Sequence, residues 1–287
     1  MKLLKSRIPF IFASAATLGM SGNSQYVIPL IGLATVGITH GSVDYELDPS
    51  SKDSRLLFFS VYLIGMLSYG VLWIANPRVA IIVFIIYSAS HFGECQWKQS
   101  YRNTPRDNLQ RSMAWLWGLF AAGFSPLYHW EETLPILNLM MGSATRFLWW
   151  TPATAQLLSF ALLGMALVGS LASKPQEDWL DAFTSSILLA WFLIKLPLLP
   201  GFLCFFSFWH SWDSISHQIQ AKNWSLLEYY RKGFLLTVVS WIGIFSLIFI
   251  LNYFGKLANF WSALFMTLGA LTISHSQAIK RFYGTIK

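Results

Sequence analysis

The sequence predicts an all-α, polytopic membrane helix bundle, and composition is the first observation that predicts it. Of the 287 residues, 55% are hydrophobic and only 11% are charged, whereas soluble globular proteins average about 25% charged residues. The second observation is that mostly apolar stretches, each about the 20 residues that a helix needs to cross a bilayer, recur from end to end. The whole chain, 1–287, is therefore expected to form a single integral membrane domain of about 8 to 10 transmembrane helices.

The apolar segments follow one another along the chain with short connections. We expect helices at residues 7–20, 25–43, 56–75, 78–96, 111–129, 134–150, 153–173, 179–198, 200–217, 230–254 and 258–279. The segment at 134–150 is interrupted by Gly142, Ser143 and Arg146. It is therefore the one that we do not expect to span the bilayer.

The basic residues predict the orientation of these helices. The formal net charge is +7, but Lys and Arg gather in short loops and at both chain ends instead of forming a patch suited to nucleic acid. Cytoplasmic loops are enriched in Lys and Arg, so we expect both termini and the basic loop at 98–111 to face the cytoplasm. A cleaved signal peptide made of Lys2, Lys5, Arg7 and the apolar run 8–20 is disfavoured, because that loop would then lie outside. We expect the plasma membrane of a prokaryotic cell.

Histidine is scarce, and four of its six copies lie where apolar segments end. These are His40, His91, His210 and His275. Ionisable side chains are costly inside a membrane, so they mark functional sites. The predicted topology places all four at similar depth in the cytoplasmic half of the bilayer, whereas His129 falls at the opposite face. A shared metal site is one interpretation, and a hydrogen bond from each histidine to a neighbouring helix is the other.

Three of these histidines are followed by an acid at position i+3 or i+4. The acids are Asp44, Glu94 and Asp213. On an α-helix this spacing places both side chains on one face, and a carboxylate behind a metal-binding imidazole orients the ring. We expect the three acids to have this role. Direct ligation, as in sites with two histidines and a carboxylate, and simple placement at the membrane interface are the alternatives.

The histidine motifs resemble those of a known enzyme family. Residues 37–44, Gly-Ile-Thr-His-Gly-Ser-Val-Asp, resemble the G-x-P-H-G-x-x-D signature of the Brp/Blh-like β-carotene 15,15′-dioxygenase family. His91-Phe92-Gly93 looks like its second histidine motif, Phe208-Trp209-His210-Ser211 is similar to its third, W-H-S-x-x-H, and His275 matches a late histidine. The resemblance implies a membrane enzyme that uses histidine-bound iron(II) and O2 to cleave β-carotene centrally into retinal. It implies His40, His91 and His210 as ligands.

The sequence departs from the family pattern at four positions. Thr39 and Ser274 stand where proline is common, and Tyr45 stands where a second histidine often follows the aspartate. Ser214 occupies the place of the second histidine in W-H-S-x-x-H. Because a hydroxyl is a poor substitute for imidazole on iron, we expect His275 to be the fourth ligand and Ser214 to lie behind the ligands.

The aromatic side chains, 17% of the residues, predict the carotenoid contacts. Flat rings suit a polyene, because apolar ligand sites are lined by such side chains. We expect Phe92, Trp97, Phe206 and Trp209 to contact the substrate, although Trp and Tyr are also enriched at membrane interfaces. Imidazole suits iron, zinc, copper and nickel, so ligand type alone does not select the metal. Cys95 and Cys204 lie inside apolar segments, and we expect neither a disulfide nor a thiolate site.

Two other functions remain open on this sequence. One is a non-catalytic membrane protein that binds a carotenoid or retinal and assists assembly of a pigment protein. The other is a metal-ion or proton transporter, in which intramembrane His and Asp form a relay. The partners expected for the oxygenase are a lipid-soluble carotenoid, O2 and membrane lipid, with a functional link to a rhodopsin-type retinal protein.

Overall fold

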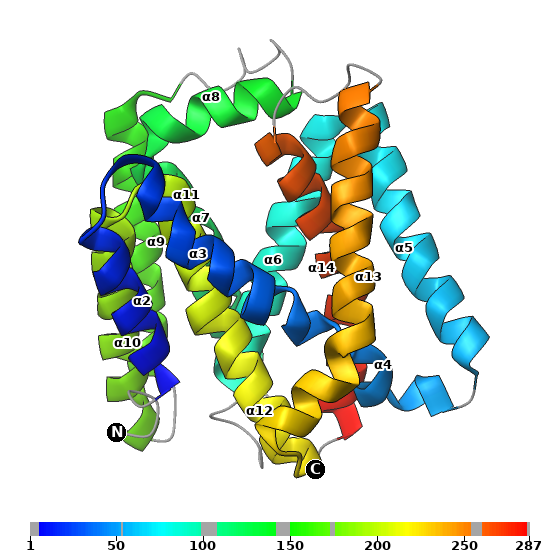
Figure 1. Ribbon diagram of the computed structural model, residues 1–287. Helices are drawn as coiled ribbons and strands as arrows, with labels where there is room; N and C mark the ends of the chain where they lie inside the picture. The colour runs from blue at the N-terminus through cyan, green and yellow to red at the C-terminus, as the bar shows by residue number, and fades with distance from the viewer. Residues whose placement is uncertain are drawn as a thin grey trace. The chain divides into compact units, whose positions relative to one another are not determined.

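The computed structural model describes residues 6–52, 54–98, 108–141, 150–172, 176–253 and 260–285. The predicted all-α class is confirmed, and no strand occurs within these ranges. The α-helices (Figure 1) are α2 (Ile8–Leu18), α3 (Val27–Gly32), α4 (Asp44–Leu47), α5 (Arg55–Ala75), α6 (Pro77–Lys98), α7 (Asn108–Tyr128), α8 (Trp130–Met141), α9 (Pro152–Ala172), α10 (Gln176–Lys195), α11 (Leu198–Cys204), α12 (Trp212–Lys222), α13 (Leu226–Tyr253) and α14 (Phe260–Thr285).

Five described segments are long and apolar enough to cross a membrane. They are Gly22–Leu47, Arg55–Ala75, Pro77–Trp97, Pro152–Leu171 and Leu226–Ile250. Large apolar side chains stand out from α5 and α13, with Leu56 79% and Leu227 78% exposed. Such surfaces are stable against lipid and unfavourable in water. The predicted total of about 8 to 10 spans stays a prediction.

Two predicted spans are shorter or less complete in the structure. The first expected span contains α2, whose 11 residues reach about half of the roughly 30 Å hydrocarbon core. In the interrupted segment at 134–150, α8 ends at Met141, while Gly142, Ser143 and Arg146 lie outside the described residues.

Two other predicted helices are broken at their functional ends. In the segment 25–43, α3 is followed by a π-helical turn, η2 (Leu33–Gly37), and a 3-10 turn, η3 (Thr39–Gly41). In the segment 200–217, a π-helical stretch, η6 (Phe205–Ser211), separates α11 from α12. Departures from regular α-helix of this kind often occur at functional sites. They change which side chains share a face.

The described helices form two compact units, each made of three stretches of chain. Unit 1 comprises residues 1–37, 88–133 and 149–217, and unit 2 comprises residues 38–87, 134–148 and 218–287. The prediction of a single domain over 1–287 stays a prediction.

In unit 1, small residues bring α6 and α7 into close contact. A Cβ added to Gly93 would lie 1.9 Å from the carbonyl oxygen of Ala114, and a Cβ added to Gly118 would lie 1.8 Å from that of Ala89. Each helix thus offers a pair of small residues four positions apart, an arrangement that is typical of tightly packed membrane helices. This contact fixes the part of α6 that carries His91.

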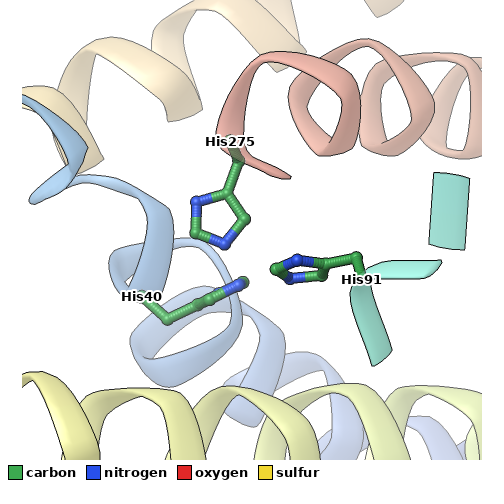
Figure 2. Close-up of side chains that lie close together, drawn as sticks. All are labelled: His40, His91 and His275. Carbon is green, nitrogen blue, oxygen red and sulfur yellow. The ribbon is translucent and has the colours of Figure 1, made fainter. Parts of the chain in front are cut away.

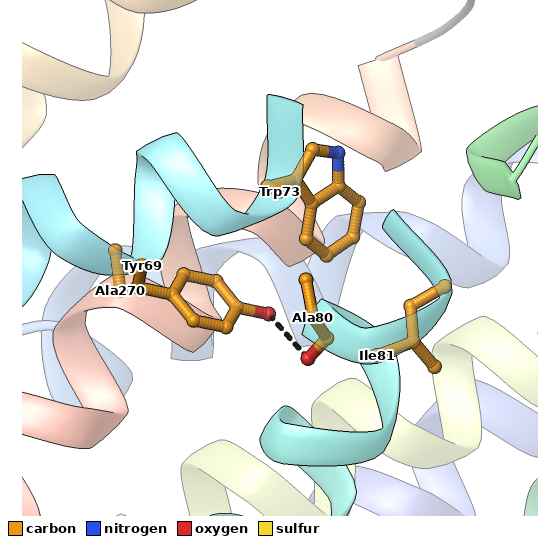
Figure 3. Packing of buried hydrophobic residues seen from close by; sticks show 5 residues of the cluster. All are labelled: Tyr69, Trp73, Ala80, Ile81 and Ala270. Atoms are coloured by element: carbon orange, nitrogen blue, oxygen red, sulfur yellow. Dashed lines mark hydrogen bonds between the residues drawn. The ribbon is translucent and has the colours of Figure 1, made fainter. Parts of the chain in front are cut away.

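In unit 2, α5 and α14 pack around a buried hydrophobic cluster (Figure 3). The cluster contains Tyr69, Trp73, Ala80, Ile81 and Ala270. The Tyr69 hydroxyl donates a hydrogen bond to the Ala80 carbonyl over 3.2 Å. The turn between α5 and α6 is set by Asn76, whose side-chain oxygen accepts from the Val79 amide. Pro77 then starts α6, because proline is favoured at the first position of a helix.

Candidate metal centre

The first group of candidate ligands lies in unit 1. His91 on α6 and His210 on η6 are both buried, and their Nε2 atoms are 3.1 Å apart. With metal–nitrogen bonds of about 2.0–2.1 Å, two imidazoles on one tetrahedral ion have nitrogens about 3.4 Å apart. The sulfur of Cys95, one helical turn after His91, lies 3.8 Å from Nδ1 and 3.9 Å from Nε2 of that ring. Ligand atoms of all three residues lie within 4.8 Å of one another.

The π-helical stretch positions His210 among aromatic rings. The Ser211 hydroxyl donates to the Phe206 carbonyl, five residues back, over 2.7 Å. Ring centroids of Phe92 and Phe206 lie 4.7 Å and 5.8 Å from that of His210, and Phe92 also meets Phe205 edge to face. Two of the four predicted substrate contacts therefore flank a candidate ligand.

A small pocket of about 210 Å³, open solvent included, lies beside His210. Its lining consists of Phe92, Cys95, Gln96, Trp117, Phe205, Trp209, His210 and Asp213. Pockets for drug-sized ligands measure roughly 300–1,000 Å³. The described pocket is therefore too small to hold a long polyene.

Asp213 was expected to orient His210, and the structure gives its carboxylate another partner. Its carboxylate forms a buried ion pair with Arg7, which is 0% exposed. Arg7 also donates to Gln96 Oε1 over 3.1 Å, and its guanidinium lies 3.9 Å from the centroid of the Trp209 ring. A buried guanidinium requires a carboxylate partner. His210 lies in π-helix and Asp213 lies in α12, so the α-helical i+3 relation does not by itself bring the two side chains together, and the role of Asp213 behind His210 stays a prediction.

The remaining predicted residues of unit 1 are placed as follows. Trp209 is buried, packs edge to face on Phe10 and donates from Nε1 to Gln96 Oε1 over 3.3 Å, so its described contacts are structural. Trp97 and Ser214 are buried, and Glu94 is half-buried. The roles expected for these three residues stay predictions.

The second group of candidate ligands lies in unit 2. His40, in the turn η3, and His275, on α14, are buried with ring centroids 4.7 Å apart in an edge-to-face arrangement (Figure 2). Gly41 lies beside this pair, and a Cβ added there would lie 3.4 Å from His275 Nδ1, an ordinary contact distance. The Tyr229 hydroxyl lies 3.2 Å from the His40 carbonyl oxygen, which it helps to fix.

The Asp44 carboxylate contacts His275, whereas its i+4 spacing predicted that it would orient the His40 ring. The two carboxylate oxygens of Asp44 lie 2.8 Å and 2.9 Å from His275 Nδ1. His40 lies in a 3-10 turn and Asp44 begins the next helix, so the assumed α-helical i+4 relation does not exist. A proton held on Nδ1 by the carboxylate leaves the lone pair of a neutral His275 ring on Nε2. This is the arrangement of a carboxylate behind a metal-binding histidine.

Tyr62 on α5 completes a ring of hydrogen bonds around His275. Its hydroxyl donates to Asp44 Oδ2 over 3.0 Å, and its carbonyl accepts from the Ser274 hydroxyl over 2.8 Å. Gly65 allows this approach, because a Cβ there would lie 2.7 Å from Ser274 Oγ. The ring fixes both the Asp44 carboxylate and the part of α14 that carries His275.

Comparison with known proteins identifies the family of the chain. The family model of beta-carotene 15,15'-dioxygenase matches residues 31–283. The chain belongs to the beta-carotene 15,15'-dioxygenase family. The predicted resemblance is thereby confirmed. No curated protein and no solved structure matches the chain in the same comparisons.

The departures from the pattern of the beta-carotene 15,15'-dioxygenase family have structural roles in two cases. Ser274, where proline is common, makes the bond to the Tyr62 carbonyl described above. Tyr45, where a second histidine is common, accepts a hydrogen bond from Arg55 over 2.6 Å and stacks on Phe59.

Three residues of these sites were missed by the sequence reasoning. Cys95 carried a usable signal, since a cysteine four positions after a histidine on a helix shares its face. Tyr62 carried none, because its partner is distant in sequence and its neighbours are ordinary apolar residues. Arg7 was read only as one of the basic residues near the N-terminus, and its pairing with Asp213, 206 positions later, has no local signal in the sequence.

His129, expected at the far face, has a capping role. Its Nε2 lies 2.8 Å from the Leu193 carbonyl oxygen and its Nδ1 lies 3.2 Å from Glu132. Glu132 in turn accepts from the Leu198 amide at the start of α11. These contacts explain the histidine without a metal.

Proposed function

We propose that this protein is a membrane-embedded non-haem iron oxygenase that cleaves β-carotene, or a related carotenoid, at its central double bond with O2. The products are retinal molecules. The observation that carries the proposal is the buried pair of His91 and His210, at histidine positions of the family motifs, with Nε2 atoms 3.1 Å apart. Two imidazoles at this distance are suited to one metal ion.

The donor set fits iron(II). Imidazole nitrogen is a good ligand for iron as well as for zinc and copper. The bond from Asp44 to His275 Nδ1 supports a ligand role for that histidine. On the basis of the family motifs we assign His40, His91, His210 and His275 as the ligands. That all four bind one ion stays a prediction.

The proposed reaction balances without an external reductant. One carbon–carbon double bond and the O–O bond break, and each carbon receives one oxygen atom, so two aldehydes form. Bound iron(II) would supply the one-electron chemistry that lets O2 react with a double bond. The chain's own residues orient the imidazoles, present the double bond and keep water out, which is catalysis by positioning. We assign Phe92 and Phe206, which flank His210, to contacts with the polyene.

Loss of colour tests the proposal. A bacterial host that accumulates β-carotene should bleach when the protein is expressed, because central cleavage shortens the conjugated chain, and its extracts should contain retinal. His91→Ala and His210→Ala should each abolish bleaching. His129→Ala should bleach like the parent, because its contacts are to Leu193 and Glu132. Retinal formation by the His91 and His210 variants would refute the site assignment.

One departure favours a second candidate function. Ser214 stands where the family motif has a further histidine, and a site that lacks a ligand can bind a carotenoid or retinal without cleaving it. A well-expressed, iron-loaded parent that does not bleach its host but co-purifies with carotenoid would support this pigment-binding function. In either case we propose a prokaryotic plasma-membrane location with cytoplasmic termini and a rhodopsin-type protein as the user of retinal.

A further inference from the structure

We propose that Cys95 is a third metal-binding side chain beside His91 and His210, and that the three residues form a thiolate-containing site for a borderline or soft cation such as Zn²⁺, Co²⁺ or Cu⁺. The inference deepens the metal-centre proposal and rests on its assignment of His91 and His210 as ligands. It adds a ligand that the histidine motifs do not contain. It also changes which metals the site prefers.

The geometry of the three side chains is close to that of a bound ion. The distances are 3.1 Å between the two Nε2 atoms and 3.8–3.9 Å between Cys95 Sγ and the nitrogens of His91. Bonds of about 2.0–2.1 Å to nitrogen and 2.3 Å to sulfur place tetrahedral donor atoms about 3.4–3.6 Å apart. Cys95 Sγ is nearly equidistant from the two nitrogens of His91, so rotation of its side chain toward Nε2 is the step that brings all three donors onto one ion. All three residues belong to unit 1 and are buried.

The second cysteine of the chain shows that burial alone does not create this arrangement. Cys204 is also buried in unit 1, but its sulfur lies 3.7 Å from the Thr17 hydroxyl. Among the described residues, the groups with metal-ligand spacing include Cys95 and omit Cys204. Cys204 fits the usual role of a buried cysteine as a small apolar side chain, whereas Cys95 lies among ligating nitrogens.

Cys95 also supplies a donor atom in a chain that has Ser214 in place of a motif histidine. In the family motif the further imidazole follows His210 by four residues, and here that position offers only a hydroxyl. The sulfur of Cys95 supplies a donor from α6 instead. Thiolate is a softer ligand than imidazole, so this exchange lets the site bind Zn²⁺ or Cu⁺ as well as iron. These three side chains do not fill the coordination sphere of the ion, so positions remain for further ligands or substrate.

Cobalt is a direct probe of the thiolate. The full chain, purified in detergent and stripped of metal, is titrated with Co²⁺ while its absorption spectrum is recorded. We expect a sulfur-to-cobalt charge-transfer band in the near ultraviolet for the parent and for Cys204→Ser. Cys95→Ser should lose that band, and His91→Ala should lose cobalt binding at this site. A band that survives Cys95→Ser, or one that disappears in Cys204→Ser, would overturn the proposal.

X-ray absorption of the zinc-loaded parent needs no variant. One sulfur neighbour at about 2.3 Å beside nitrogen neighbours at about 2.0 Å is expected. A shell of nitrogen and oxygen only would overturn the proposal, as would a parent that binds neither ion. Failure of the oxygenase proposal gives a different result. A parent that never bleaches its host but shows the sulfur neighbour would support the thiolate site and contradict the oxygenase. A parent that bleaches its host and shows no sulfur neighbour would support the oxygenase and contradict the thiolate site.

Discussion

Replacing Gly93 with alanine perturbs the contact that carries His91. The added Cβ would lie 1.9 Å from the Ala114 carbonyl oxygen, about 1.5 Å short of an ordinary contact of 3.4 Å. The Ala114 oxygen belongs to the backbone and cannot rotate away, so α6 and α7 must separate. Overpacking of this kind costs about 1–3 kcal/mol, and a separation beyond 1 Å places the cost at the upper end. Because alanine has a higher helix propensity than glycine, the substitution offsets about 0.5–1 kcal/mol of this cost. The free energy of unfolding should therefore fall by about 2 kcal/mol.

Thermal unfolding in detergent measures this change, and Gly164→Ala is the matched control. Gly164 lies on α9 in the same unit, and nothing is within 4 Å of its added Cβ. A loss of 2 kcal/mol corresponds to a melting temperature lower by roughly 5 °C, whereas the Gly164 variant should melt at or slightly above the parent. Gly93→Ala should also weaken cobalt binding, because His91 is two residues away. A Gly93→Ala protein as stable as the Gly164→Ala protein would refute the packing argument.

Substitutions at Asp44, Tyr62 and Arg7, with two control substitutions, test the buried polar contacts. Asp44→Asn should weaken metal binding about 10- to 100-fold, as expected for a carboxylate behind a ligand; an unchanged affinity in metal titration would remove that role. Tyr62→Phe should weaken metal binding less than Asp44→Asn does. Tyr69→Phe, which loses a similar hydrogen bond on the same helix, should leave metal affinity unchanged. Equal metal affinities for the two tyrosine variants would show that the Tyr62 hydroxyl has no role in metal binding. Arg7→Ala should destabilise the protein by about 3–5 kcal/mol, because it leaves a buried carboxylate unpaired. Thermal unfolding should show partial recovery when Asp213→Ala is added, and no recovery would mean that the ion pair is not the cause.

The helical architecture was predictable because its cause is local. Composition and the length of the apolar runs predict membrane helices, and Pro77 and Pro152 each begin a helix. The breaks at η3 and η6 were not predicted, because Thr39–Gly41 and Phe205–Ser211 lie within longer segments whose composition suits a continuous membrane helix. A π-helical turn depends on packing against distant segments. Both breaks occur at predicted ligands, His40 and His210.

The same breaks explain why the acids after His40 and His210 have partners that the sequence did not predict. A spacing of i+3 or i+4 brings side chains together only where the backbone is α-helical throughout. Asp44 and Asp213 follow their histidines across 3-10 and π-helical backbone, and their carboxylates bond residues distant in sequence, His275 and Arg7. Where α6 is regular, the spacing rule does hold. There, four positions after His91, the residue on the shared face is Cys95.

The histidine motifs of this chain therefore determine only part of its candidate metal site. The motif supplies imidazoles, but the remaining donors and the groups that orient them come from whichever helix packs alongside. For His275 these groups are Asp44 and Tyr62, on two other elements of unit 2. For His91 the additional donor lies on its own helix, so it is the one feature of the site that helical spacing alone identifies. Metal preference in this chain should therefore follow Cys95 more closely than it follows the histidines, because imidazole is compatible with several metals and thiolate selects among them.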